Sequence, residues 1–171
     1  MKRIMTMLVV IVATLSAAAQ ETVDFRYGCI SYDTVLKAMP EYAKAEADLE
    51  ALKQKYDAET KASEEEFNSK YEVFLSEHAN YAPSILRKRQ SELEDLMKRN
   101  ENFRAESVRL LKQSWEEMLK PAKDKLNTII KNIAAQYSLA FVLNTDSDAV
   151  PYLNIDMAYN ITAAVEEALK Q

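Results

Sequence analysis

The fold is decided by two glycine-free stretches, EYAKAEADLEALKQKYDAETKASEEEFNSKYEVFLSE (residues 41–77) and SILRKRQSELEDLMKRNENFRAESVRLLKQSWEEMLK (residues 84–120). Their apolar side chains mirror each other about Asn80, so that partners lie at equal distances from the turn. Antiparallel helices joined by a short connection pair in this order. The mirrored pairs are Leu49 with Leu111, Leu52 with Val108, Phe67 with Leu93, and Phe74 with Leu86. The pattern predicts a long helical hairpin, the arm, over residues 41–120, with its tip near residues 78–84.

The charges of the two stretches are complementary as well. Residues 41–77 carry 5 basic and 11 acidic residues, whereas residues 84–125 carry 11 basic and 8 acidic residues. Opposite charges attract across a short distance, so an acidic outgoing helix beside a basic returning helix favours the antiparallel pair.

The outgoing helix presents a row of residues spaced by three, four and seven, as the seam of a coiled coil requires. This row weakens at Thr60 and Ser63, which face Asn100 and Met97 in the mirrored register. Polar residues in a seam lower stability and set register. A weak point could equally act as a hinge, and the sequence leaves both interpretations open. The full row is Tyr42, Ala45, Leu49, Leu52, Tyr56, Thr60, Ser63, Phe67 and Phe74.

Residues 1–19 have the three parts of a secretory signal peptide. A cationic start at Lys2 and Arg3 precedes an apolar run over residues 4–15, and residues 17–19 form an Ala-Ala-Ala cleavage site. The apolar run is shorter than the roughly 20 residues of a membrane span, so an uncut anchor is the less favoured interpretation. The pattern predicts export to the periplasm.

The composition opposes several classes of site. The single glycine, Gly28, cannot build a phosphate-binding loop, which needs several glycines. The single His78 and single Cys29 are too few for a multi-histidine metal site or an internal disulfide. A net charge of −5, or −7 once Lys2 and Arg3 leave with the signal peptide, opposes general nucleic-acid binding. We therefore expect no enzyme activity, no cofactor, no metal and no nucleic-acid partner.

Both ends of the chain are expected to form one small body, over residues 20–40 and 121–171, into which the arm is inserted. The predicted fold class is therefore α+β and mostly helical. A body of this size buries little core alone, and small cores commonly need oligomerisation. The candidates for the contact between subunits lie in two predicted strands: Cys29 and Ile30 in the first, and Phe141, Val142 and Leu143 in the second.

Strands are predicted over residues 26–32, 139–143 and 149–153. The last is placed at a sheet edge, because Pro151 cannot donate a ladder hydrogen bond. Gly28 inside the first strand suggests a bulge or a close backbone contact.

The remaining segments are predicted to be helices and turns. Ser31 or Asp33 is expected to cap a short helix, and residues 160–162 to cap a last helix over residues 163–170. Pro121 should kink or interrupt the returning helix. Residues 144–148 lack the glycine and the closing glutamate of a calcium loop, so a polar turn is expected there.

The tip of the arm carries a basic cluster, Arg87-Lys88-Arg89, on an otherwise acidic chain. One interpretation is a solvated face that pairs with Glu72 and Glu77. The other is electrostatic capture of an anionic partner, or weak contact with a membrane surface.

Apolar and aromatic side chains occur at low density along the arm among many charges. Such a surface can hold apolar segments of another chain without aggregating, although the same side chains could serve only to join the two helices. Tyr71 and Phe103 lie off the mirrored row, which favours contact with a client. All candidates for client contact are Tyr56, Phe67, Tyr71, Phe74, Leu93, Met97 and Phe103.

Four motifs together resemble the Skp/OmpH family of periplasmic chaperones. They are Ile30 to Leu36 after the first strand; Leu119-Lys120-Pro121 before Lys125-Leu126 and Ile129-Ile130; Ile133-Ala134 before Leu139 to Leu143; and Asn160-Ile161-Thr162 before Val165 and Leu169. Their order around a glycine-free hairpin, behind a signal peptide, covers essentially the whole mature chain. This chain departs from the family at Ser31, where an aspartate is usual, and in being acidic where well-known members are basic.

The resemblance implies a homotrimer whose bodies form an intersubunit β-barrel and whose three arms surround a cavity. That cavity would hold unfolded outer-membrane proteins in the periplasm, without ATP. The alternative function is a structural coiled-coil adaptor or spacer of the cell envelope, which would bind one partner and fail to suppress aggregation of others.

Overall fold

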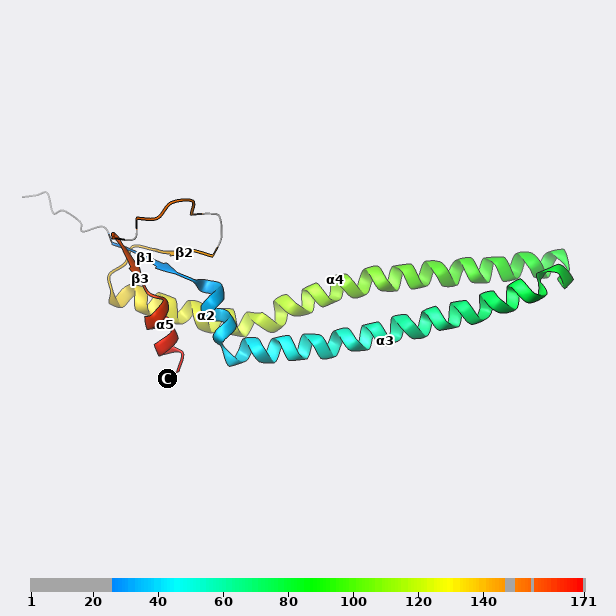
Figure 1. The fold of residues 1–171 in the computed structure, drawn as a ribbon, viewed down its shortest axis with the longest axis horizontal. Helices are drawn as coiled ribbons and strands as arrows, with labels where there is room; N and C mark the ends of the chain where they lie inside the picture. The colour runs from blue at the N-terminus through cyan, green and yellow to red at the C-terminus, as the bar shows by residue number, and fades with distance from the viewer. Residues whose placement is uncertain (1–25, 147–149, 155, 171) are drawn as a thin grey trace, which may run out of the picture.

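The computed structural model describes residues 26–146, 150–154 and 156–170. It is a long two-helix arm attached to a small body (Figure 1). The arm consists of α3 (Pro40–Glu77), the short 3₁₀ helix η2 (His78–Asn80) and the distal part of α4 (Pro83–Gln136). Both long helices have proline at their first position, where a missing N–H costs no intrahelical hydrogen bond. The predicted helical hairpin is thus confirmed. The signal peptide predicted for residues 1–19 lies outside the described residues.

The seam of the arm joins α3 and α4 along their length. Every residue of the row predicted for α3 is half-buried or buried. On α4 the seam runs through residues spaced by three and four, as in a coiled coil. These residues are Leu93, Leu96, Asn100, Phe103 and Ser107, and all of them are half-buried or buried.

The mirrored register was wrong by one residue at two places on α4. Val108 is 66% exposed and Met97 is 48% exposed, so neither lies in the seam. Their preceding neighbours, Ser107 and Leu96, are buried instead. Mirroring by equal distance from the turn ignores helical phase, and adjacent helix positions point about 100° apart because a turn takes 3.6 residues.

Pro121 does not interrupt α4, so that part of the prediction was wrong: the helix continues through it to Gln136. A proline inside a helix typically costs about 3 kcal/mol through a lost hydrogen bond and a clash. Its neighbours Leu119, Ala122 and Leu126 are all buried, and their packing offsets that cost. One continuous helix therefore belongs to both the arm and the body.

The body contains a three-stranded parallel sheet of order β2-β1-β3. Its strands are β1 (Tyr27–Ile30), β2 (Val142–Asn144) and β3 (Ala158–Asn160). The strand predicted over residues 139–143 begins later, at Val142. No strand forms at residues 150–154, so the edge strand predicted around Pro151 was wrong in the described part of that segment. The third strand is β3, which is too short to show a period-two pattern.

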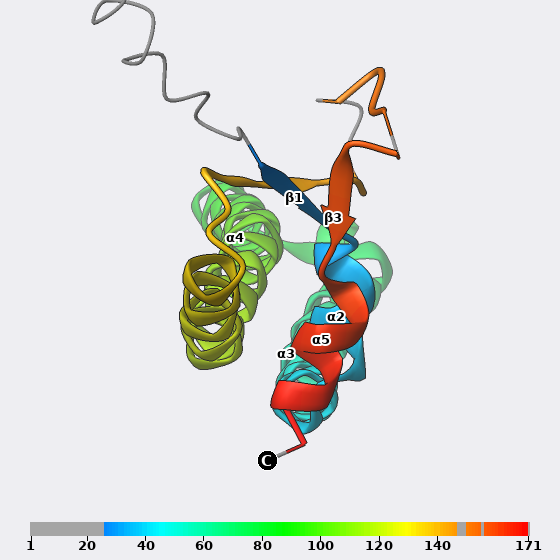
Figure 2. The same cartoon turned by 90° about the vertical axis from the view of Figure 1, so that its left-hand side faces the viewer.

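Two short helices, α2 (Tyr32–Ala38) and α5 (Thr162–Ala168), complete the body. Viewed along the arm from the body end, the strands lie across one edge of the helices, with α4 on one side and α2 and α5 on the other (Figure 2). The core between these elements includes Val35, Leu126 and Val165, all fully buried.

The short helices are capped from distant parts of the chain. The Asp33 N–H donates to Asp146 Oδ2 over 2.6 Å, so a carboxylate beyond β2 caps α2. Ser31 stands at the N-cap position, as expected, but its hydroxyl binds Asp146 Oδ1 and Thr34 rather than a backbone N–H. The Thr162 N–H donates to Asn160 Oδ1 over 3.0 Å, in agreement with the predicted cap of the last helix.

Gly28 sits where β1 packs most closely. A Cβ added there would lie 2.8 Å from Leu139 Cδ1 and 3.3 Å from Val142 Cγ2. The pairing of β1 with both neighbours is regular, so the structure shows a close contact at Gly28 and no bulge.

Candidate functional site

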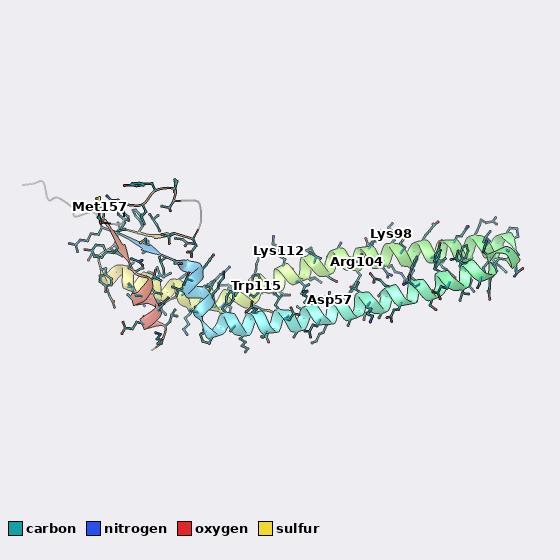
Figure 3. The ribbon with its side chains drawn as sticks, viewed as in Figure 1. Asp57, Lys98, Arg104, Lys112, Trp115 and Met157 are labelled. Carbon is teal, nitrogen blue, oxygen red and sulfur yellow. The ribbon has the colours of Figure 1, made fainter. Side chains whose placement is uncertain are left out.

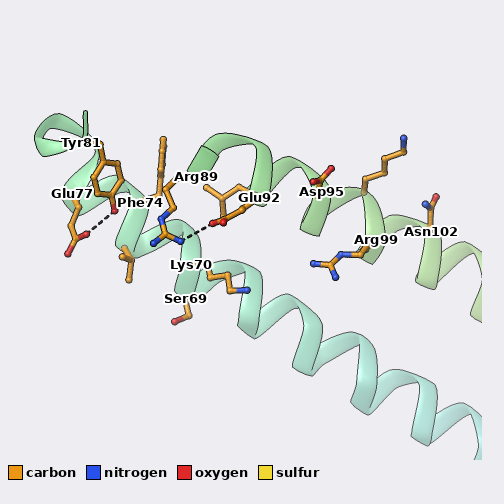
Figure 4. A pocket seen from close by; sticks show the side chains of 13 residues that line it. Ser69, Lys70, Phe74, Glu77, Tyr81, Arg89, Glu92, Asp95, Arg99 and Asn102 are labelled. Carbon is orange, nitrogen blue, oxygen red and sulfur yellow. Dashed lines mark hydrogen bonds and ion pairs between the residues drawn. The ribbon is translucent and has the colours of Figure 1, made fainter. Parts of the chain in front are cut away.

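An open groove lies between α3 and α4 just behind the tip of the arm (Figure 4). It has a volume of about 890 Å³. We call it the distal groove. Its lining comprises Ser69, Lys70, Val73, Phe74, Glu77, Tyr81, Arg89, Glu92, Leu93, Asp95, Lys98, Arg99 and Asn102.

The apolar part of the groove is built around Phe74 and Leu93. Both side chains are half-buried, because they occupy seam positions of α3 and α4. The Phe74 ring lies 5.8 Å from the His78 ring and 6.4 Å from the Tyr81 ring, centroid to centroid. Phe74 and Tyr81 lie at the tip end of the groove (Figure 4).

The tip turn is held by side-chain hydrogen bonds. The Tyr81 hydroxyl donates to Glu77 Oε2 over 2.8 Å, and this bond to a carboxylate raises the pKa of Tyr81. The Nδ1 atom of His78 lies 2.9 Å from the Leu75 carbonyl oxygen at the end of α3. His78 is exposed and lies in the predicted tip region, residues 78–84.

Three cationic side chains, Lys70, Arg89 and Arg99, reach into the space between the two helices (Figure 4). Arg89 donates to Glu92 over 2.8 Å, and Lys70 donates to Glu66 over 2.5 Å. These hydrogen bonds hold the pKa values of Glu92 and Glu66 below the ordinary value of a glutamate.

Four cations line the groove, and two of them, Lys98 and Arg99, form no direct ion pair with a carboxylate among the residues that the structure describes. Arg99 acts on Glu66 at longer range and contributes to the lowered pKa of that carboxyl. A guanidinium offers five N–H donors in a planar fork that matches a carboxylate. The distal groove therefore combines an apolar floor with an available cation, which suits non-covalent binding of an amphipathic group.

The predicted client-contact residues are divided by the structure into two sets. Phe74 and Leu93 lie in the distal groove. Tyr56 and Phe103 face each other in the seam with ring centroids 6.1 Å apart, so Phe103 is a seam residue and does not lie off the row.

The other three candidates lie outside the groove. Phe67 is half-buried and stacks on Tyr71 with centroids 5.8 Å apart. Tyr71 is 43% exposed, and Met97 points away from the seam.

The basic cluster at residues 87–89 pairs differently from the expectation. Arg89 and Lys88 contact Glu92, one turn along the same helix, at 2.8 Å and 3.8 Å. No pairing with Glu72 or Glu77 is present in the described structure. Neighbours on one helix are three or four residues apart, so Glu92 is within reach without crossing the seam.

The predicted subunit-contact residues lie in and beside the sheet. Cys29 and Ile30 are buried within the protomer, and burial raises the pKa of the Cys29 thiol. Because β1 is paired on both sides, the free edges of the sheet belong to β2 and β3. Val142 and Leu143 are half-buried in β2, and Phe141 is 42% exposed. The Phe141 ring stacks on Tyr27 with centroids 5.8 Å apart.

Sequence reasoning missed Lys70 and Arg99. Lys70 follows Phe67 by three residues and precedes Phe74 by four, so its spacing places it beside the seam, although its side chain is exposed. Arg99 follows Leu96 by three residues. The helical spacing around the seam could therefore have identified both cations.

The described part of the chain contains no cluster of three or more His, Cys, Asp or Glu side chains that could hold a metal ion. None of its helices is both long enough and apolar enough to cross a membrane.

Comparisons with known proteins agree with this architecture. No curated protein matches the chain. Among solved structures, the fold is similar to a crystal structure, at 2.83 Å resolution, of a protein described as an outer membrane chaperone (OmpH-like) from Caulobacter crescentus CB15. The TM-score is 0.68 and the sequence identity 17%, and the similarity covers 85% of this chain and 83% of that chain. Residues 26–169 match the protein family described as Outer membrane protein (OmpH-like). The chain therefore belongs to the OmpH-like family.

Proposed function

We propose that this protein is an ATP-independent chaperone that holds unfolded outer-membrane proteins in the periplasm. The observation that carries the proposal is the surface of the arm, where apolar side chains are exposed among many charges on both helices. Family membership and the chaperone description of the similar Caulobacter protein support the same role.

The exposed apolar side chains are numerous but dispersed. Side chains project on all sides of the arm (Figure 3), and charged residues lie among the apolar ones, although Val73 and Leu75 flank Phe74 with no charge between them. Partial burial of one such side chain against a client contributes about 1 kcal/mol. Many weak contacts of this kind can form and break independently, which suits a client without fixed structure. The residues are Tyr71, Val73, Leu75, Ile85, Met97 and Val108, between 43% and 66% exposed.

We further propose a homotrimer with the arms around a shared cavity. Two features support assembly: a small core, and two sheet edges, β2 and β3, without a described neighbour on their outer sides. Open edges favour pairing with another strand. Phe141→Glu should weaken assembly while leaving the protomer folded, because Phe141 is 42% exposed. Sedimentation velocity measures the result, and unchanged assembly of a folded variant argues against this interface.

The periplasmic location rests on the predicted signal peptide at residues 1–19 together with the OmpH-like family. Removal of those residues should be seen as a mass decrease when the protein is isolated from the periplasmic fraction.

The test of the function uses the chain without residues 1–19. An outer-membrane β-barrel protein unfolded in urea is diluted into buffer with or without this protein, and light scattering follows its aggregation. Multi-angle scattering then measures the mass of the complex. Suppressed aggregation of several unrelated clients, with three copies per client, supports the trimeric chaperone. Binding of one partner without general suppression supports the adaptor of the cell envelope instead.

A further inference from the structure

We infer that the distal groove of a single arm binds an extended polypeptide segment in which an apolar side chain lies close to a carboxylate. This inference rests on the proposed function and makes it specific, because it places part of the client between α3 and α4 of one protomer. The apolar side chain contacts Phe74 and Leu93, and the carboxylate pairs with Arg99.

The floor of the groove provides the apolar contact. Phe74 and Leu93 are only half-buried although they occupy seam positions, so each keeps surface that a client side chain can cover. The aromatic cluster of Phe74, His78 and Tyr81 favours an aromatic client side chain in particular, because rings prefer offset or edge contacts with other rings.

The cations provide the polar contact. Arg99 forms no direct ion pair among the described residues and acts on Glu66 only at longer range, while Lys70 and Arg89 already contact Glu66 and Glu92 directly. A carboxylate that enters the groove gains a charge-assisted hydrogen bond from Arg99 without breaking an existing pair. Lys70 lies on the opposite helix and adds attraction from the other side of the groove.

The mixed charge of the groove selects a polypeptide rather than a membrane surface. The lining carries four cations but also the three acidic residues Glu77, Glu92 and Asp95. Such carboxylates repel the continuous negative charge of an anionic bilayer. A peptide segment instead presents one carboxylate among neutral N–H and C=O groups, and its N–H groups can donate to the acidic residues.

The test measures binding of a short peptide with phenylalanine two residues before aspartate, labelled with tetramethylrhodamine. In an extended chain this spacing places both side chains on one face. Fluorescence anisotropy gives the dissociation constant for the protein without residues 1–19 at low salt. A second peptide replaces aspartate with asparagine. Arg99→Gln should weaken binding of the aspartate peptide about tenfold, as expected for one charge-assisted contact, and should hardly change binding of the asparagine peptide.

Lys112→Gln is the matched control. It removes the same charge from an exposed position of α4 that does not line the groove. Circular dichroism verifies that both variants keep their helices. Equal weakening by Arg99→Gln and Lys112→Gln overturns the inference, because attraction would then be unspecific. A second experiment measures binding of the protein to vesicles containing phosphatidylglycerol. Binding of vesicles that depends on Arg99, with no such dependence for the peptide, overturns the inference in favour of a membrane surface.

The failure of this inference differs from the failure of the proposed function. If the protein suppresses aggregation but peptide binding does not depend on Arg99, the groove assignment is wrong and the chaperone function stands. If the peptide binds through Arg99 but aggregation is not suppressed, the groove is a peptide site and the chaperone function is wrong.

Discussion

Replacement of Leu96 by alanine should loosen the arm, whereas the same replacement at the adjacent Met97 should not. Leu96 is 4% exposed in the seam, while Met97 is 48% exposed and points outward. Leucine-to-alanine changes in protein cores cost about 2–5 kcal/mol. A two-helix seam can partly close over the lost volume, so the low end, about 2 kcal/mol, applies to Leu96. Alanine also favours helix slightly over either residue, which leaves Met97→Ala within about 0.5 kcal/mol of the parent.

Hydrogen–deuterium exchange of arm peptides measures this difference directly. Exchange through local opening reports the free energy of that opening, and about 2 kcal/mol corresponds to roughly 30-fold faster exchange. We therefore expect roughly 30-fold acceleration in α3 and α4 peptides around Leu96, and less than threefold for Met97→Ala. Protein concentration is kept constant, since assembly changes apparent stability. Equal acceleration by the two variants would refute the helical phase assigned to the seam.

Three further predictions concern the body and its junction with the arm. Gly28→Val should lower the free energy of unfolding by about 2 kcal/mol, because even one added carbon meets Leu139 at 2.8 Å. A smaller loss is expected for Gly28→Ala. Urea denaturation measures the free energy of unfolding of both variants. Asp146→Ala should cost about 1 kcal/mol in the same assay, because the cap of α2 is lost, and a neutral result would exclude a capping role. The hydrogen bond from Lys125, at 2.7 Å, holds the pKa of Glu41 below its ordinary value. Because the pKa of Glu41 is lowered in the folded state, its ionised form stabilises the fold at neutral pH, and this stabilisation is lost as the pH falls through the folded-state pKa. The destabilisation caused by Lys125→Met should therefore shrink between pH 7 and pH 3. A constant difference between the two thermal unfolding midpoints would contradict the ion pair.

The long helices were predictable because their signals are local. The absence of glycine over residues 41–136, the three-and-four spacing of apolar residues, and prolines at helix starts each act within a few turns. The position of the turn could be predicted for the same reason. The sequence did not decide which face of α4 packs against α3, because Leu96 and Met97 are adjacent and both are apolar. Only packing against α3 distinguishes which of the two faces the seam.

The continuity of α4 through Pro121 shows how tertiary contacts override a local signal. Proline disfavours helix from local geometry alone. Burial of Ala122 and Leu126, which lie in the core with residues of α2 and α5, adds a favourable term that depends on those helices being in place. This favourable free energy of burial cannot be inferred from the sequence next to Pro121 alone.

The candidate site was predictable in part. Phe74 and Leu93 were predicted as apolar residues of the arm, and Arg89 as part of the basic cluster at the tip; the structure places all three in the groove. Lys70 and Arg99 come from opposite helices and are far apart in sequence. Their approach to one groove depends on the rotation of each helix about its axis.

The sequence by itself determined the glycine-free hairpin, its acidic and basic sides, and the position of its tip, because helix periodicity and turn chemistry are encoded over a few residues. Only the tertiary structure decided three other features. They are the phase of the α4 seam, the place of β3 beside β1, and the placement of Lys70, Arg89 and Arg99 along one groove with Phe74. The physical reason is common to all three. Each depends on contacts between segments distant in the chain, whose free energy comes from packing and charge proximity that no local pattern contains.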